Sequence, residues 1–218
     1  MTRYFTITIL LFTLSLCSVQ DTLPKSPSSI YKLCYFTGYD PVDNIDFNSY
    51  MSDFDYPNIP AYAITTGISL DFGYGRFRHG IEFAMHNIME VNNSSKNIDL
   101  WGLQAYYKTY LTQSFKRLDI SPSLGIGMQE YFVNTKLNSD DTNLSSVMTA
   151  VRFAIIIDIF NNHSFSRHYG KFLRITCGYI IPFGISDWER MLGSKDLYPP
   201  TISPEGIFIQ IGYGNSGK

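Results

Sequence analysis

The sequence predicts an all-β chain that closes into an antiparallel, up-and-down transmembrane β-barrel of about eight strands. The first observation is alternation. From residue 62 to residue 72 every second side chain is mostly bulky and apolar, as in Ile64, Ile68 and Phe72, and those between are small or polar. Successive side chains of a strand point to opposite faces, so this segment has one apolar and one hydrophilic face. The alternation returns in most later segments, as expected for strands with lipid outside and a polar interior.

Composition is the second observation. The chain holds 16 Tyr and 16 Phe among 218 residues, which suits aromatic girdles at two membrane interfaces. The formal net charge of −2 makes a nucleic-acid partner unexpected. Beyond the N-terminal segment no run of about 18 apolar residues occurs, so we expect no transmembrane helix. No ligand pattern for a metal or cofactor is present, and we expect neither.

The N-terminal residues are typical of an export signal. Arg3 supplies a positive start, residues 7–16 form an apolar stretch too short to span a membrane as a helix, and polar residues follow from Ser18. We therefore expect a cleaved signal peptide over residues 1–19 and one barrel domain over residues 20–218. A lipid-modified Cys17 is the less favoured alternative, because the bulky Leu16 stands where a small residue normally precedes such a cysteine.

Each expected strand combines the alternation with a length near the roughly 9–11 residues that a tilted strand needs to cross a bilayer. Eight segments in chain order meet both conditions: residues 30–39, 61–73, 76–90, 98–111, 118–132, 147–160, 172–183 and 206–213. Bulky side chains mark the outward face of these segments, for example Tyr31 and Tyr35, Ile68 and Leu70, Phe83 and Met85, Leu103 and Tyr107, Leu124 and Ile126, Phe153 and Ile155, and Ile209 and Ile211.

The lengths of the connections predict which end of the barrel faces out. The first and seventh, residues 40–60 and 186–205, are long, whereas the second is the tight Tyr74-Gly75 turn and the fourth spans only residues 112–117. Outer-membrane barrels have short periplasmic turns and longer external loops, which places the long connections outside. The sixth connection, residues 161–171, is longer than this rule predicts.

Charged residues recur on the hydrophilic face, and we treat them as the candidate site. The eight candidates for interior ion pairs are Asp71, Arg78, Glu82, Lys108, Asp119, Arg152, Asp158 and Arg174. Facing opposite charges stabilise a sheet, and unpaired charges in a narrow interior are costly. An eight-stranded barrel leaves room for little besides side chains, so an ion-pair network is favoured over a catalytic relay.

The symmetry of the hairpins predicts particular partners among these charges. A turn at Tyr74-Gly75 places Asp71 opposite Arg78. In the next periplasmic hairpin Lys108 is expected diagonal to Asp119. Around the sixth connection Asp158 is expected opposite Arg174. Glu82 shares a face with His86, with Lys108 and Arg152 expected nearby.

Three features resemble the small eight-stranded outer-membrane barrels, especially the outer-membrane β-barrel domain proteins of the Bacteroidetes type. They are the signal ending Ser18-Val19-Gln20, the run Gly178-Tyr179-Ile180-Ile181-Pro182-Phe183, and the closing Gly206-Ile207-Phe208-Ile209-Gln210-Ile211-Gly212-Tyr213. The resemblance covers residues 29–213. It implies the outer membrane of a Gram-negative bacterium, a last strand read by the barrel-assembly machinery, and contact with outer-membrane lipid. A similar barrel serves in the type IX secretion apparatus, so a secretion or surface-complex partner is a further expectation.

The expected function is non-enzymatic: an integral outer-membrane barrel with a structural, adhesive or assembly-accessory role, which presents external loops and has no wide pore. The first alternative is a hydrolase that modifies lipid A, suggested by His163, Ser164, Ser166 and His168, although a polar surface turn explains these residues better. The second is a soluble, lipocalin-like barrel that binds a small apolar ligand. The acidic first connection, with Asp40, Asp43, Asp46, Asp53 and Asp55, is expected to be solvated or to bind a partner.

Overall fold

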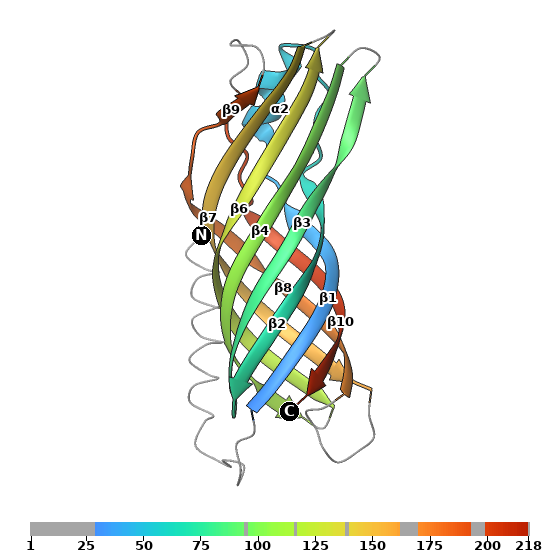
Figure 1. Ribbon diagram of the computed structural model, residues 1–218, viewed down its shortest axis with the longest axis vertical. Coiled ribbons are helices and arrows are strands. Elements are labelled where there is room, and N and C mark those ends of the chain that lie inside the picture. The colour runs from blue at the N-terminus through green and yellow to red at the C-terminus, as the bar shows by residue number, and fades with distance from the viewer. Residues whose placement is uncertain are drawn as a thin grey trace.

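The computed structural model describes residues 29–93, 96–115, 117–137, 140–161, 170–192 and 199–217. Eight long strands form a closed antiparallel barrel in which neighbours in the chain are neighbours in space. Their bounds are β1 Ser29–Pro41, β2 Tyr62–Tyr74, β3 Phe77–Asn93, β4 Lys96–Leu111, β6 Leu118–Leu137, β7 Asp140–Phe160, β8 Gly170–Ile185 and β10 Gly206–Gly217. The barrel closes because β1 pairs with both β2 and β10 (Figure 1). This confirms the predicted eight-stranded, up-and-down barrel.

Three short elements lie in segments that the sequence predicted as connections. Helix α2 (Ile45–Ser52) occupies the first connection, β5 (Gln113–Phe115) extends the hairpin with β6, and β9 (Glu189–Leu192) pairs with β7. No helix among the described residues is long and apolar enough to cross a membrane. The expected signal peptide, residues 1–19, lies outside the described residues.

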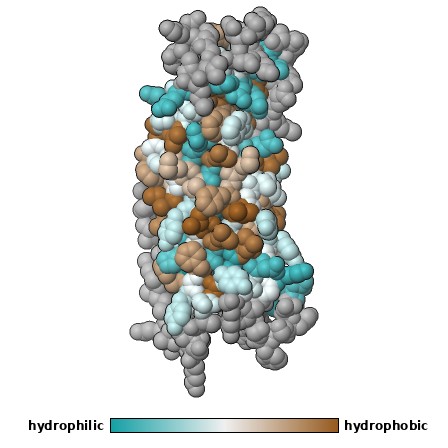
Figure 2. All heavy atoms as spheres, in the orientation of Figure 1, coloured by the Kyte–Doolittle hydropathy of each residue, from teal (hydrophilic) through white to brown (hydrophobic). Residues whose placement is uncertain are grey.

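A belt of apolar side chains covers the outer face of the barrel, in the phase that the alternation predicted. Ile126 and Met128 of β6 are 54% and 55% exposed, and Ile209 and Ile211 of β10 are 47% and 53% exposed. Figure 2 shows hydrophobic side chains gathered across the middle of the visible face, with hydrophilic side chains toward both ends of the described part. Exposed aromatic residues at the two rims of the belt include Tyr31, Tyr74, Phe77 and Phe115 near one end and Tyr39, Tyr62 and Phe183 near the other.

Beyond the belt the longest strands reverse their polarity. Strands β6 and β7 have 20 and 21 residues and stay paired to Leu137 and Asp140, well past their predicted ends. In this extension the inward Tyr131 and Val133 are fully buried, whereas the outward Asn134 is polar and partly exposed. The stacked rings of Trp101 and Phe132, with centroids 4.0 Å apart, mark the level at which the polarity changes.

The part of the wall with reversed polarity encloses a small apolar core, which α2 helps to fill. We call this end of the molecule, with its core and the connections that cover it, the cap. Phe47 and Met51 of α2 are fully buried there against Leu100, Tyr131 and Leu144 of the extended strands. Trp188 from the seventh connection packs on Phe47, with ring centroids 6.3 Å apart. The first connection was expected to be solvated or to bind a partner, and its aspartates Asp43, Asp46, Asp53 and Asp55 are exposed. One face of α2 is nevertheless buried, because Phe47 and Met51 complete the cap core. Figure 1 shows α2 and β9 together at this end.

Candidate functional site

Below the cap, the barrel interior contains a continuous series of buried ion pairs. At the end nearest the cap, Arg152 of β7 lies 2.8 Å from Glu82 of β3 and 3.0 Å from Asp40 of β1. Glu82 also contacts Lys108 of β4 at 3.4 Å. The guanidinium of Arg152 donates to Gln104, and its carbon lies 3.8 Å from the centre of the Tyr106 ring. Planar contacts of this kind suit arginine better than lysine.

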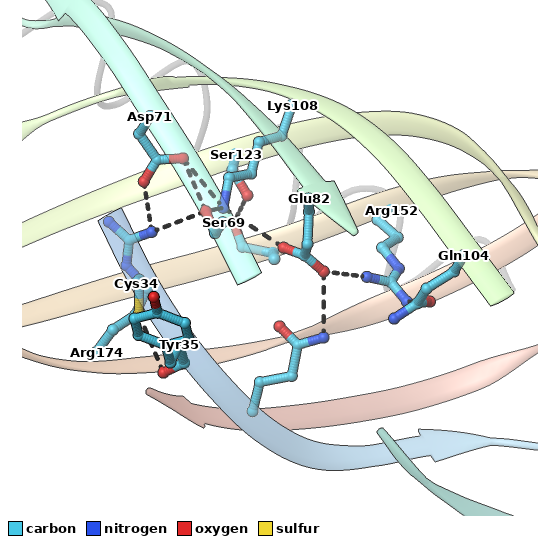
Figure 3. A network of polar contacts seen from close by, with 12 residues as sticks. Cys34, Tyr35, Ser69, Asp71, Glu82, Gln104, Lys108, Ser123, Arg152 and Arg174 are labelled. Carbon is cyan, nitrogen blue, oxygen red and sulfur yellow. Dashed lines mark hydrogen bonds and ion pairs between the residues drawn. The ribbon is translucent and has the colours of Figure 1, made fainter. Parts of the chain in front are cut away.

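The series continues toward the opposite end through Asp71. Its carboxylate lies 3.3 Å from Lys108 and 2.5 Å from Arg174. Arg174 also donates from Nε and Nη2 to the two oxygens of Asp158, at 2.7 and 2.9 Å. Lys32 then links Asp158 at 2.7 Å to Asp119 at 3.2 Å. Figure 3 shows the central contacts of Arg174, Asp71, Lys108, Glu82 and Arg152, which come from different strands and converge inside the barrel.

The alternation that predicts the apolar outer face also places every candidate inside. Asp71, Arg78, Glu82, Lys108, Asp119, Arg152, Asp158 and Arg174 are all buried. Asp158 and Arg174 are directly opposed in the ladder between β7 and β8, as the hairpin symmetry predicted. Glu82 meets both Lys108 and Arg152, which sequence reasoning placed near it.

The predicted opposition of Asp71 and Arg78 is wrong. The ladder sets Gly80 opposite Asp71 and Gly73 opposite Arg78. The loop of this hairpin consists of Gly75 and Arg76, because Tyr74 still pairs with Phe77. Gly75 has φ +62°, a backbone conformation that favours glycine at this place in a two-residue hairpin. The register therefore differs by two residues from the prediction, and the ion pairs of Asp71 reach Lys108 and Arg174.

The predicted diagonal contact between Lys108 and Asp119 is also wrong. Lys108 faces Gly125 in the ladder, and the ion pair of Asp119 is with Lys32. The reason is β5, which pairs with the first residues of β6 and moves the hairpin turn beyond Phe115. Asp119 consequently lies farther toward the turn end than a symmetric hairpin around residues 112–117 would place it.

Sequence reasoning missed two members of the network, Lys32 and Asp40. Both lie on β1 in phase with the buried Ile30 and Cys34, so the alternation used elsewhere could have found them. Asp40 was assigned to the acidic first loop instead, because the strand was expected to end at Tyr39. Its carboxylate also lies 3.7 Å from Nδ1 of the buried His86.

The network fills the interior and balances its charge. Among the residues that the structure describes, five buried carboxylates, Asp40, Asp71, Glu82, Asp119 and Asp158, accompany five buried cations, Lys32, Arg78, Lys108, Arg152 and Arg174. Between Glu82, Tyr106 and Arg152 remains a void of about 20 Å³, which is enough for one water molecule. A charged interior of this kind suits a closed barrel that excludes solutes and opposes the lipocalin-like alternative, which requires an apolar cavity.

Two other kinds of site find no support among the described residues. No group of three or more His, Cys, Asp or Glu side chains in the described ranges could hold a metal ion. The residues that suggest a lipid A hydrolase, His163, Ser164, Ser166 and His168, lie outside the part of the chain that the structure describes.

The comparisons with known proteins concern the fold. No family model matches the sequence, and no curated protein matches it. Among solved structures, a major outer membrane protein from Thermus thermophilus superposes with a TM-score of 0.52 at 8% identity, covering 87% of this chain and 100% of that chain. Neisserial surface protein A (TM-score 0.47, 10% identity, 89% and 99% covered) and the N-terminal β-barrel domain of Pseudomonas aeruginosa OprF (0.43, 9%, 88% and 100%) are also similar.

The likeness to the Thermus protein shows that this chain has the fold of an outer-membrane β-barrel, here with eight strands. The Bacteroidetes-type resemblance stays an expectation, because no family match accompanies it.

Proposed function

We propose that this chain is a non-enzymatic, integral barrel of the outer membrane of a Gram-negative bacterium, which conducts no solute and holds the cap above the bilayer. The observation that carries the proposal is the reversal of polarity along the strands. Within the belt the apolar side chains face out and the charges face in, which suits lipid. In the cap the apolar side chains face in, as in a soluble domain.

The structures of the two barrel ends support one orientation of the protein in the membrane. The first and seventh connections meet in the cap, where Asp43 and Ser203 form a β-bridge. The opposite end carries the first residue of β1, the last residues of β10 and the two-residue turn at Gly75 and Arg76. Short turns lie on the periplasmic side in such barrels, so the cap faces the exterior.

A structural, adhesive or assembly-accessory role fits this design, because the barrel would fix a folded surface outside the cell. The exposed charged side chains among the described residues of the cap are acidic and include Asp43, Asp46, Asp53, Asp55, Asp99 and Asp187. A partner in a surface or secretion complex would meet this acidic surface. The barrel-assembly machinery and outer-membrane lipid are the other partners that we propose.

Two substitutions on one face of β6 test membrane insertion. Leu124 lies outward in the belt and is 38% exposed, so we expect Leu124→Arg to lower the free energy of unfolding in vesicles by about 2–4 kcal/mol, the cost of a cation near the bilayer midplane. The matched control is Asn134→Arg, outward on the same strand but beyond Phe132. It should change the free energy by less than about 0.5 kcal/mol.

Equal tolerance of both arginines would contradict the membrane assignment, because in water the two positions are alike. A carbonate wash of membranes supplies an independent readout. Retention of the protein until detergent is added supports insertion, and release by carbonate alone overturns it.

The sidedness predicts a labelling pattern on whole cells. In a Cys177→Ser background, we expect Ser49→Cys on the exposed face of α2 to react with a membrane-impermeant maleimide, and Ser114→Cys in β5 to react only after lysis. Both serines are exposed, so accessibility to the reagent differs only through the membrane. If only Ser114→Cys were labelled on intact cells, the orientation would be the opposite of the one proposed.

A further inference from the structure

A groove of about 600 Å³ opens on the outer face of the barrel at the end opposite the cap. It lies where β1, β2 and β3 meet the turn end, and its lining includes Ser29, Tyr31, Phe72, Tyr74, Phe77 and His79. Phe72, Tyr74 and Phe77 are 49%, 61% and 47% exposed and belong to the rim of the apolar belt. The groove is thus a continuation of the surface that lipid covers in the proposed function, on which this inference rests.

The polar centre of the groove is His79, an imidazole on the lipid-facing side. Its Nδ1 lies 2.5 Å from the hydroxyl of Tyr107. The ring of Phe77 meets it edge-on at 4.6 Å, and the ring of Phe72 stacks on it at 5.9 Å. None of the described residues hydrogen-bonds to Nε2, so a fixed imidazole presents one nitrogen to a ligand beside an apolar surface.

A partly exposed cation, Arg76, lies in the turn next to two residues that line the groove, Tyr74 and Phe77. Its backbone carbonyl accepts a hydrogen bond from Thr112 at 2.8 Å, which fixes the turn. No described residue forms an ion pair with the Arg76 guanidinium. The turn therefore supplies a cation beside the groove, and Phe77, His79 and the aliphatic Ile81 follow it along the outer face of β3.

We infer that this groove binds one anionic phospholipid of the periplasmic leaflet. A phospholipid presents its groups in the same order from water to hydrocarbon: a phosphate, ester carbonyls and acyl chains. Arg76 can pair with the phosphate, for which a guanidinium is well suited. His79 Nε2–H can donate to an ester carbonyl, and Tyr31 and Phe72 flank the acyl chains. Cations beside a membrane surface favour anionic over zwitterionic headgroups.

The test uses the folded protein in vesicles of phosphatidylcholine that contain a small fraction of phosphatidylglycerol with a photoactivatable group near the headgroup. After illumination, mass spectrometry of the digested protein locates the label. We expect crosslinks concentrated between residues 72 and 79, suppressed by unlabelled phosphatidylglycerol and not by additional phosphatidylcholine. Arg76→Gln should reduce the crosslinks about threefold to fivefold. The double variant with Arg76→Gln and His79→Phe should reduce them further.

Matched variants separate specific binding from general contact with lipid. Lys171→Gln removes another exposed cation at the same end, on β8, and Met85→Phe adds an aromatic ring higher on β3. Neither should change the crosslinks at the groove. Heat-modifiable migration on a gel establishes that each variant is inserted and closed, so failure of insertion is distinguished from failure of lipid binding. Labelling spread evenly around the belt, labelling unchanged by Arg76→Gln, or protection of the groove by residues 20–28 of the chain would each overturn the inference.

Discussion

Replacing Arg174 by methionine is expected to lower the free energy of unfolding of the barrel by about 3–5 kcal/mol, the cost of removing one partner from a buried ion pair. Arg174 is 3% exposed and bridges Asp71 and Asp158. Without it these carboxylates remain inside the barrel, where Asp71 keeps its ion pair with Lys108 and Asp158 keeps its ion pair with Lys32. The measurement is equilibrium unfolding in urea from vesicles, followed by tryptophan fluorescence.

A double-mutant cycle shows whether the loss arises from the ion pair. Asp158→Asn removes the carboxylate that faces Arg174, so the double variant should lose less stability than the sum of the single variants, with a coupling of about 1–3 kcal/mol. Lys171→Met, an exposed cation three residues earlier on β8, is the control and should change stability by less than about 0.5 kcal/mol. A coupling near zero between Asp158 and Arg174 would show that the network fills space without selective pairing.

The sequence was sufficient for the barrel because one physical constraint repeats along every strand. Lipid tolerates apolar side chains and the narrow interior tolerates paired charges, so each residue's phase is fixed by its neighbours two positions away. The outward Leu124 and the inward Arg152 could be assigned in this way without knowledge of any partner. Phase is a local property, and alternation reports it directly.

The register between strands is harder to predict from the sequence than the phase, because it depends on how many residues the turn contains. A shift of two residues keeps every side chain on its own face, so the alternation of apolar and polar residues does not distinguish the two registers. Asp71 and Arg78 were therefore placed inside correctly but opposed wrongly. The positive φ of Gly75 sets this register, and the same Tyr-Gly pair in the sequence is compatible with a turn centred one residue earlier.

The cap was missed for a different reason. Above Trp101 the outer face meets water, so the pattern that marks the strands inverts and the expected apolar outward row ends. The strands continue because their inward residues, such as Val133 and Leu144, find apolar partners on α2. Those partners are more than 80 residues earlier in the chain, and a single sequence gives no sign of such a contact. The strands therefore extend beyond the belt because of tertiary contacts with α2, and not because of a local sequence pattern.

Removal of the last strand is expected to abolish insertion of the barrel altogether. Strand β10 pairs with β1 from Ile209 to Gly217 and with β8 from Gly206 to Ser216. Without it, β1 and β8 present edges whose backbone groups have no partner in lipid, each costing several kcal/mol. Deletion of residues 206–218 should therefore leave no heat-modifiable folded band on a gel and no protein resistant to carbonate extraction.

A shorter deletion separates closure from stability. Asn215, Ser216 and Gly217 pair with Leu33, Lys32 and Tyr31, and the hydroxyl of Ser216 donates to the carbonyl of Gly170. These residues therefore belong to the closing strand, contrary to the expectation that it ends at Tyr213. Removing residues 215–218 should keep a closed barrel, because the rest of both ladders stays paired, but should lower its unfolding temperature measurably.

Tyr213→Ala should slow assembly without changing the final yield, if this outward aromatic residue, 52% exposed, is the signal that the assembly machinery reads. A folded band that persists after loss of the whole of β10 would contradict closure between β1 and β10, and with it the eight-stranded barrel.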